Sequence, residues 1–153
     1  MALLVGTLLP ALDGATQWLT AEAGAGDFAG CPVFVQFWAI SCPICKMNMP
    51  TLQQFLETYR AHGLRLLSVH MPRMEEDMDV ERVRAAAQEL GLTGPCAIDN
   101  RHALGDRFQT GGVWPCYLLF DAEGKLRSRA AGALGLKMAE NSLKRLLALE
   151  AVL

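Results

Sequence analysis

The sequence predicts a single α/β domain in which helices cover both faces of a mixed central β-sheet. Its 153 residues suffice for one domain with a sizeable core, and hydrophobic residues make up 52% of them, which is typical of a folded protein. Short apolar runs alternate with amphipathic segments, an order that indicates strands joined by helices. No linker or internal repeat divides residues 1–153.

The first half of the chain reads as strand, helix, strand, helix. The run PVFVQFW, at 32–38, is rich in β-branched and aromatic residues, which predicts a buried strand. The next segment ends at Gly63 and has apolar residues at helical spacing. These residues are Leu52, Phe55, Leu56 and Tyr59. A second strand at 64–70 and a second helix at 79–90 follow, which implies parallel strands with right-handed crossovers.

The second half of the chain adds a short strand at 95–98, a short helix at 103–108 and a β-hairpin. CYLLF, at 116–120, and KLRSRAA, at 125–131, form the hairpin, and DAEG between them is typical of a tight turn. A final helix closes the domain. Its core-facing residues are Leu143, Leu146 and Leu147.

The N-terminal segment, MALLVGTLLPAL, is apolar but lacks the features of a signal peptide. No Lys or Arg precedes Lys46, whereas a signal peptide carries a basic n-region. Gly6 and Pro10 interrupt the run, which is also too short to span a bilayer. We therefore expect this segment, the beginning of a loop-like stretch over residues 1–31, to belong to the folded protein, and the protein to be cytoplasmic. A signal trimmed from the sequence would instead indicate an exported form.

The charge balance excludes two classes of partner. The net charge is −2 and no long run of one sign is present. Nucleic acids and anionic membranes both require a basic patch, so we expect neither nucleic acid binding nor membrane insertion. The charged stretch RMEEDMDVER, at 73–82, is expected to be a solvated loop that leads into a helix, and His102 is expected to be solvated.

Cys42 and Cys45 lie three residues apart, immediately after the first predicted strand. Cys42 falls at the strand-to-helix junction, where free N–H groups and the helix dipole stabilise a thiolate. Pro43 suits the first helical position, which needs no N–H donor. Cys42 is therefore expected to be the exposed attacking thiol, and Cys45 the more buried thiol that resolves a mixed disulfide. The other three cysteines are expected to be free and buried, and they are Cys31, Cys96 and Cys116.

The residues alone leave other roles open for the CxxC pair. A structural disulfide that closes so small a loop would remove little chain entropy. A zinc or copper site would need further ligands, and no second CxxC is present, although His70 could assist. A CxxC at a buried-strand-to-helix junction within a βαβ unit is, however, typical of a redox motif.

Two motifs resemble a known family. FWAISCPICKMNMP, at 37–50, resembles the FWA-x-x-C-x-x-C-x-x-x-x-P signature of thioredoxin-like proteins, and is most similar to their TlpA/ResA-like thiol–disulfide oxidoreductases. VWPCYLLFDAEGKL, at 113–126, resembles the later segment of that branch, in which a proline precedes a strand and a D-x-x-G-K turn. The resemblance covers about residues 33–132 and implies a thioredoxin-like fold.

The resemblance also implies a substrate face. Pro115 is expected to be a cis-proline that faces the CxxC motif, with Trp114 at the surface where the family pairs its backbone with an extended substrate segment. Ile44 and Trp114 are expected to form an apolar patch beside Cys42 that docks a protein partner, and Pro43 belongs to the same substrate-binding set.

The sequence departs from the family at two positions. Many thioredoxins carry a buried acid where this chain has Gln36, and many ResA-like proteins carry a Glu where it has Asn48. Neither amide can act as a general base. Gln36 either satisfies backbone polar groups only, or belongs to an amide or water network through which Cys45 slowly loses its proton.

His70 and Cys116 are further residues that could tune the site. His70 ends the second strand, at the sheet edge that also holds Cys42, so it either tunes the thiolate, helps to bind a metal, or caps a strand end. Cys116 follows Pro115, so it either forms an alternative disulfide or packs as a small apolar residue.

We therefore predict a thiol–disulfide oxidoreductase, acting as a reductase on protein or small-molecule thiols, with no bound cofactor and no metal. A module that binds a metal or a partner through its CxxC motif is the second hypothesis. A thiol peroxidase ranks last, because that chemistry usually needs a Thr and an Arg around the attacking cysteine. Ser41 and Pro43 flank Cys42, and no nearby Arg is apparent.

Overall fold

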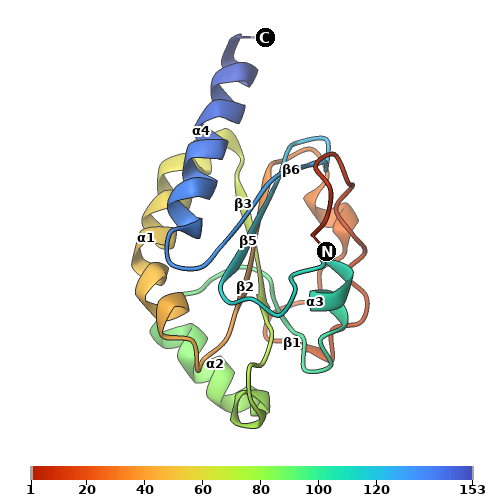
Figure 1. The fold of residues 1–153 in the computed structure, drawn as a ribbon, viewed down its shortest axis with the longest axis vertical. Coiled ribbons are helices and arrows are strands. Elements are labelled where there is room, and N and C mark those ends of the chain that lie inside the picture. Colours follow the sequence, from red (N-terminus) through yellow and green to blue (C-terminus); the bar gives the residue numbers. More distant parts are fainter. Residues whose placement is uncertain (1, 153) are drawn as a thin grey trace.

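The structure is a computed structural model that describes residues 2–152, with side chains to residue 148. Within this range, six strands form one mixed sheet in the order β1-β4-β3-β2-β5-β6. The strands are β1 (Gln17–Trp18), β2 (Val33–Trp38), β3 (Arg65–His70), β4 (Cys96–Ile98), β5 (Cys116–Phe120) and β6 (Leu126–Ala131). The predicted mixed sheet is confirmed (Figure 1).

The central strand, β2, is buried along its whole length, as its apolar sequence predicts. It runs parallel to β3, which runs parallel to β4, and the helices α1 (Pro43–Tyr59) and α2 (Val80–Glu89) make the crossovers between them. On its other side β2 pairs antiparallel with β5, and β5 pairs antiparallel with β6 in the predicted hairpin. β2 therefore has strand neighbours on both sides, and its C-terminal end lies between β3 and β5.

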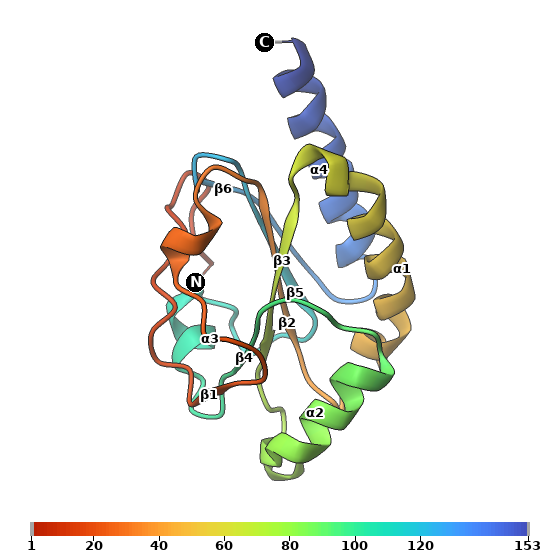
Figure 2. The ribbon, with the colours of Figure 1, turned by 180° about the vertical axis from the view of Figure 1, so that it is seen from behind.

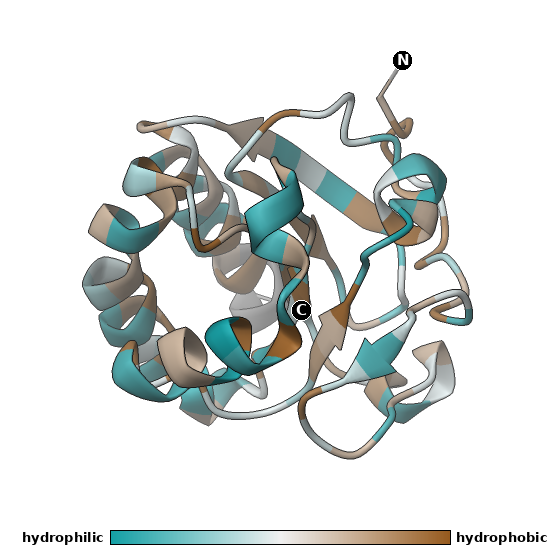
Figure 3. Ribbon diagram, turned by 90° about the horizontal axis from the view of Figure 1, so that it is seen from below, coloured by the Kyte–Doolittle hydropathy of each residue, from teal (hydrophilic) through white to brown (hydrophobic). Residues whose placement is uncertain are grey.

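Helices cover both faces of the sheet, as predicted (Figures 1 and 2). α1, α2 and α4 (Gly135–Val152) pack on one face, over a core that includes Phe34 and Tyr117. α3 (Ala103–Arg107) and the N-terminal segment pack on the other face. Figure 3 shows hydrophobic stretches on the central strands and both colours on the surrounding helices, as expected of helices with one buried face.

Three short 3-10 helices complete the described structure, and they span Ala25–Phe28, Arg60–His62 and Glu75–Met78. The N-terminal segment belongs to the fold, as expected: Leu12 is buried, and Leu8 forms an antiparallel bridge with Lys125 beside β6. The expectation of a loop throughout residues 1–31 is wrong, because β1 pairs with β4 at the opposite edge of the sheet. A two-residue strand carries no periodicity from which sequence could predict it.

Candidate functional site: the Cys42–Cys45 disulfide

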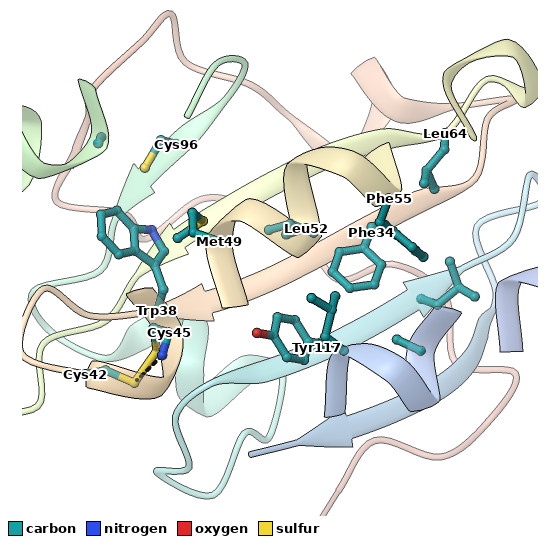
Figure 4. Packing of buried hydrophobic residues seen from close by; sticks show 14 of the residues in the cluster. Phe34, Trp38, Cys42, Cys45, Met49, Leu52, Phe55, Leu64, Cys96 and Tyr117 are labelled. Atoms are coloured by element: carbon teal, nitrogen blue, oxygen red, sulfur yellow. Dashed lines mark hydrogen bonds between the residues drawn. A yellow bond between two sulfur atoms is a disulfide. The ribbon is translucent and has the colours of Figure 1, made fainter. Parts of the chain in front are cut away.

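Cys42 is the N-cap residue of α1, and Pro43 occupies the first turn. The backbone of Cys42 is extended, and its Sγ accepts a hydrogen bond from the backbone N–H of Cys45 at 3.1 Å, drawn as a dashed line in Figure 4. A proline at this position removes an N–H that would otherwise lack a helical partner. In the reduced protein the same amide and the positive end of the helix dipole would favour a thiolate at Cys42.

Cys42 and Cys45 are joined by a disulfide, with their Cα atoms 5.3 Å apart. Cys42 exposes 3% of its surface and Cys45 exposes 2%, and both belong to the core cluster under α1. The prediction that Cys42 is the exposed member of the pair is therefore wrong for this oxidised state, in which both cysteines are buried. The N-cap position of Cys42, and not its exposure, distinguishes the two cysteines.

Trp38, the last residue of β2, is fully buried in the same core cluster as the disulfide. Figure 4 shows its indole ring beside Cys96. Burial raises the pKa of the Cys96 thiol to about 12, and Trp38 offsets part of that shift. Cys96 therefore stays protonated near neutral pH, and Trp38 is an internal fluorophore close to the redox pair.

The Trp114–Pro115 peptide bond is cis, as the resemblance implies. Pro115 directly precedes β5, where Cys116 lies opposite Phe37 of β2. The loop that ends at Pro115 and the loop that leads to Cys42 therefore lie at the same end of two paired strands. The Nε1 atom of Trp114 donates a hydrogen bond to the Met71 carbonyl at 2.6 Å.

Apolar side chains surround the buried disulfide. Pro43 is exposed, while Ile44 and Trp114 are half-buried and pack against the cluster that contains the cysteines. Val113, one residue before Trp114, is 40% exposed. The two loops that meet at this end of the sheet therefore present an apolar surface.

The two amides at the family's acid positions bond to partners other than the cysteines. The Nε2 atom of Gln36 donates to Ser68 Oγ at 2.9 Å, because the β2–β3 register places these residues side by side. Gln36 is thus satisfied by a side chain, and the interpretation that it serves backbone groups is wrong. Asn48 donates from Nδ2 to the Tyr117 hydroxyl at 3.1 Å. Burial raises the pKa of Tyr117, and the bond from Asn48 offsets part of that rise.

His70 is fully buried at the end of β3. Its Nε2 atom accepts the backbone N–H of Ile40, two residues before Cys42, at 3.1 Å. Burial lowers the pKa of His70 to about 4, against an opposing effect of the Asp77 carboxylate. The imidazole is therefore neutral near pH 7 and supplies no positive charge to a thiolate. Its role is to accept a backbone N–H from the loop that follows β2.

Cys116 lies on the face of the sheet opposite the disulfide, in the core covered by α3. The sheet therefore separates it from Cys42 and Cys45, which excludes the alternative disulfide and confirms the packing interpretation. Burial raises the pKa of the Cys116 thiol, and Arg129 offsets part of that rise. Cys31 is half-buried rather than buried, and its Sγ donates to the Phe28 carbonyl.

The sequence did not reveal two residues that hold Ser41, the residue before Cys42. Ser41 Oγ donates to the buried carboxylate of Asp77 at 2.6 Å, and Arg73 Nη1 donates to the Ser41 carbonyl at 2.6 Å. The statement that no Arg is near Cys42 is therefore wrong, because the chain after β3 folds back beside the start of α1. Within the charged stretch at 73–82, nothing in the sequence marks Asp77 as buried.

Within residues 2–152, no group of three or more His, Cys, Asp or Glu side chains is placed to hold a metal ion. Over that same range, no helix combines the length and apolar character needed to cross a membrane.

Comparison with known proteins places this site in a family. The AhpC/TSA family model matches residues 6–129. The chain is 39% identical over 141 residues to the thiol-disulfide oxidoreductase YkuV of Bacillus subtilis. The match covers 92% of this chain and 94% of YkuV. It is 28% identical over 127 residues to the thiol-disulfide oxidoreductase ResA of Geobacillus thermodenitrificans, covering 83% of this chain and 66% of ResA.

Solved structures agree with these relatives. The solution structure of a thioredoxin-like protein in its oxidised form matches with a TM-score of 0.83 at 37% identity, and the match covers 94% of this chain and 96% of that one. The predicted thioredoxin-like fold is thereby confirmed, and the disulfide at the start of α1 fits a CxxC redox site. The chain belongs to the AhpC/TSA family and is a thiol–disulfide oxidoreductase.

Proposed function

We propose that the protein reduces disulfides in other proteins, with Cys42 as the attacking thiol and Cys45 as the resolving thiol. The observation that carries this assignment is the hydrogen bond from the Cys45 N–H to Cys42 Sγ at the helix N-terminus. That amide favours negative charge on Cys42, whereas Cys45 lies one turn into the helix. The two thiols are therefore chemically unequal although they are equally buried.

The reaction follows from this inequality. The Cys42 thiolate attacks one sulfur of the substrate disulfide, so that a mixed disulfide forms and the first substrate thiolate leaves and takes up a proton. Cys45 then loses its proton and attacks Cys42 Sγ. The Cys42–Cys45 disulfide forms, the mixed disulfide breaks, and the second substrate thiolate leaves and takes up a proton. Two electrons and two protons pass to the substrate in each cycle.

We assign substrate binding to the apolar surface around the disulfide. Trp114 and Pro115 lie at the same end of the sheet as Cys42, where an extended segment could pair with the backbone before the proline. Pro43 and Ile44 sit between the two cysteines and would contact the residues that flank the substrate disulfide. Gln36 and Asn48 carry no charge, so the proton of Cys45 would leave through water or the amide network.

Three free thiols support a cytoplasmic location for such a reductase. Cys31, Cys96 and Cys116 are unbonded in a protein whose CxxC pair is oxidised. Free thiols are usual in cytosolic proteins, which supports the cytoplasm as the proposed location. The dithiol itself carries the electrons, and partner dithiols would restore it without a bound cofactor.

A redox titration in dithiol buffers tests this proposal. Trp38 fluorescence follows the pair, and alkylation of Cys42 and Cys45 measures the reduced fraction at each potential. We expect one reversible two-electron couple near ~−270 mV, typical of a reductase, and a value near ~−120 mV would reverse the direction. Cys42→Ser should abolish the couple. If the wild-type protein shows no couple, or a metal masks its thiols, a binding module replaces the enzyme.

A further inference from the structure

The chain between β3 and α2 is hydrogen-bonded to the loop that carries Cys42. We call residues 70–77 the bridging segment and residues 39–42 the cysteine loop. His70 accepts the Ile40 N–H at 3.1 Å, and Asp77 accepts the Ser41 hydroxyl at 2.6 Å. Arg73 donates to the Ser41 carbonyl at 2.6 Å. Three hydrogen bonds therefore hold the two residues that precede Cys42.

The same bridging segment also holds the other half of the site. Its Met71 carbonyl accepts the indole N–H of Trp114 at 2.6 Å. Its Pro72 carbonyl lies 2.7 Å from His102 Nε2, which donates to it, so the expectation that His102 is solvated is wrong. We call residues 113–115 the proline loop. The bridging segment is thus bonded directly to both the cysteine loop and the proline loop.

Asp77 is the most deeply buried charged residue of the bridging segment, with 1% of its surface exposed. One carboxylate oxygen, Oδ2, accepts both the Ser41 hydroxyl and the backbone N–H of Arg73, the latter at 2.9 Å. Burial of a carboxylate is costly unless its hydrogen bonds are made, and bonds to an ionised acceptor are the strong ones. Because the Asp77 carboxylate is buried, it cannot exchange its bond to the Ser41 hydroxyl for a bond to solvent. That bond therefore fixes the position of Ser41.

We infer that Asp77 is a positioning residue for disulfide exchange, which sets the distance between Cys42 and the proline loop through Ser41, Arg73 and the Met71–Trp114 bond. The inference rests on the proposed function. An extended disulfide substrate must reach Cys42 and the proline loop at once, whereas a small disulfide needs Cys42 alone. Misplacement of a reacting group by about 1 Å can cost up to ~100-fold in rate. Loss of Asp77 should therefore slow the extended substrate selectively.

The test compares two substrates on the reduced, full-length protein. One is the disulfide dimer of a linear peptide that carries a single cysteine, and the other is hydroxyethyl disulfide. The variants are Asp77→Asn, Ser41→Ala and the double variant. We expect the ratio of rate constants, peptide over small disulfide, to fall about tenfold in each single variant and no further in the double variant, because the two residues form one contact.

The ratio separates positioning from other effects. Any change that removal of the Asp77 charge makes to the reactivity of Cys42 acts on both substrates, so that effect cancels in the ratio. Glu76→Gln is the matched control, because it removes an exposed charge from the same segment, and it should keep the wild-type ratio. If Asp77→Asn fails to fold by circular dichroism, Ser41→Ala carries the test, since it removes one half-buried hydroxyl.

Two results would overturn the inference while leaving the proposed function intact. One is an unchanged ratio in a folded, active Ser41→Ala protein. The other is a fall in the double variant equal to the product of the single falls. A wild-type protein that reacts with neither disulfide would instead overturn the proposed function, and this inference with it.

Discussion

The N–H of Cys45 donates to the Sγ of Cys42 at 3.1 Å while a disulfide joins the same two residues. Reduction breaks the covalent link, and the amide remains in place to stabilise a thiolate on Cys42. Cys45 belongs to the helix that supplies this amide, so it stays within reach of the mixed disulfide. One helical turn therefore holds the attacking group, its stabilising donor and the resolving group.

Cys45→Ser should trap the reaction halfway. Cys42 would still attack a substrate disulfide, but the mixed disulfide would persist because no second thiol is placed to cleave it. Mass spectrometry of the reduced variant, mixed with the peptide disulfide, should show the peptide attached at Cys42. Cys31→Ser, which changes a half-buried thiol outside the site, should turn over normally and show no trapped species. Full turnover by Cys45→Ser would refute the role of Cys45.

Asn48→Glu should accelerate the resolving step. Asn48 lies one turn after Cys45 on α1 and bonds to the Tyr117 hydroxyl, so a carboxylate there could accept the proton of Cys45. General bases contribute roughly 10²–10⁴-fold in well-formed sites, and we expect the lower end here. Stopped-flow release of the second substrate thiol would measure it. Asn48→Gln keeps the amide and should show no gain, and an unchanged rate in Asn48→Glu would remove the idea.

His70 should make the protein less stable in acid. Its pKa is about 4 in the folded protein against 6.5 when unperturbed, so between these values the unfolded chain binds the extra proton. Stability therefore rises with pH across this window and is lost as the pH falls from 6.5 toward 4. The loss should be about 3 kcal/mol when complete.

Urea unfolding at several pH values between roughly 4.5 and 7.5 measures this change in the free energy of unfolding. The range is chosen from the two pKa values of His70. His70→Gln should flatten the slope, because Gln can still accept the Ile40 N–H but does not titrate. Burial also raises the pKa of Asp99, which gives a contribution of opposite sign. The difference between wild-type and variant cancels that contribution. His62→Gln, at an exposed position, should keep the wild-type slope.

The cysteines should differ sharply in reactivity toward iodoacetamide in the reduced, native protein. Cys42 should react first, because the N-terminus of α1 and the Cys45 N–H favour its thiolate, and Cys31 should react more slowly although it is the more exposed of the two. Cys96 and Cys116 should stay unmodified until urea unfolds the protein, since burial removes access and raises both thiol pKa values. Peptide mapping by mass spectrometry assigns each site. Native-state labelling of Cys116 would contradict its place in the core.

Local patterns made much of this fold predictable. The apolar run of β2, the Asp121–Gly124 turn and the Cys42–Pro43 helix start are each determined within a few residues, so sequence reasoning located them. The cis bond before Pro115 came from resemblance, because no local pattern of residues predicts it. The family resemblance thus predicted a backbone feature that interactions between neighbouring residues do not determine.

The remaining features depend on contacts between distant parts of the chain. Asp77 resembles its acidic neighbours in sequence, and it is buried only because the chain after β3 turns toward Ser41. Gln36 bonds to Ser68 because β3 pairs with β2 in one register. β1 exists because the edge of β4 offers it hydrogen bonds. Such partners become visible only when the sheet is assembled.

The N-terminal segment reaches both edges of the sheet. Gly6 and Thr7 exchange hydrogen bonds with Leu126, the first residue of β6, while Thr16 and Leu19 bond to β4 at the far edge. Synthesis produces these residues long before β6, so a nascent chain must wait for more than a hundred further residues before that edge closes. Deleting residues 2–19 would leave both edge strands open to other chains, and self-association, not failed catalysis, is the defect to look for.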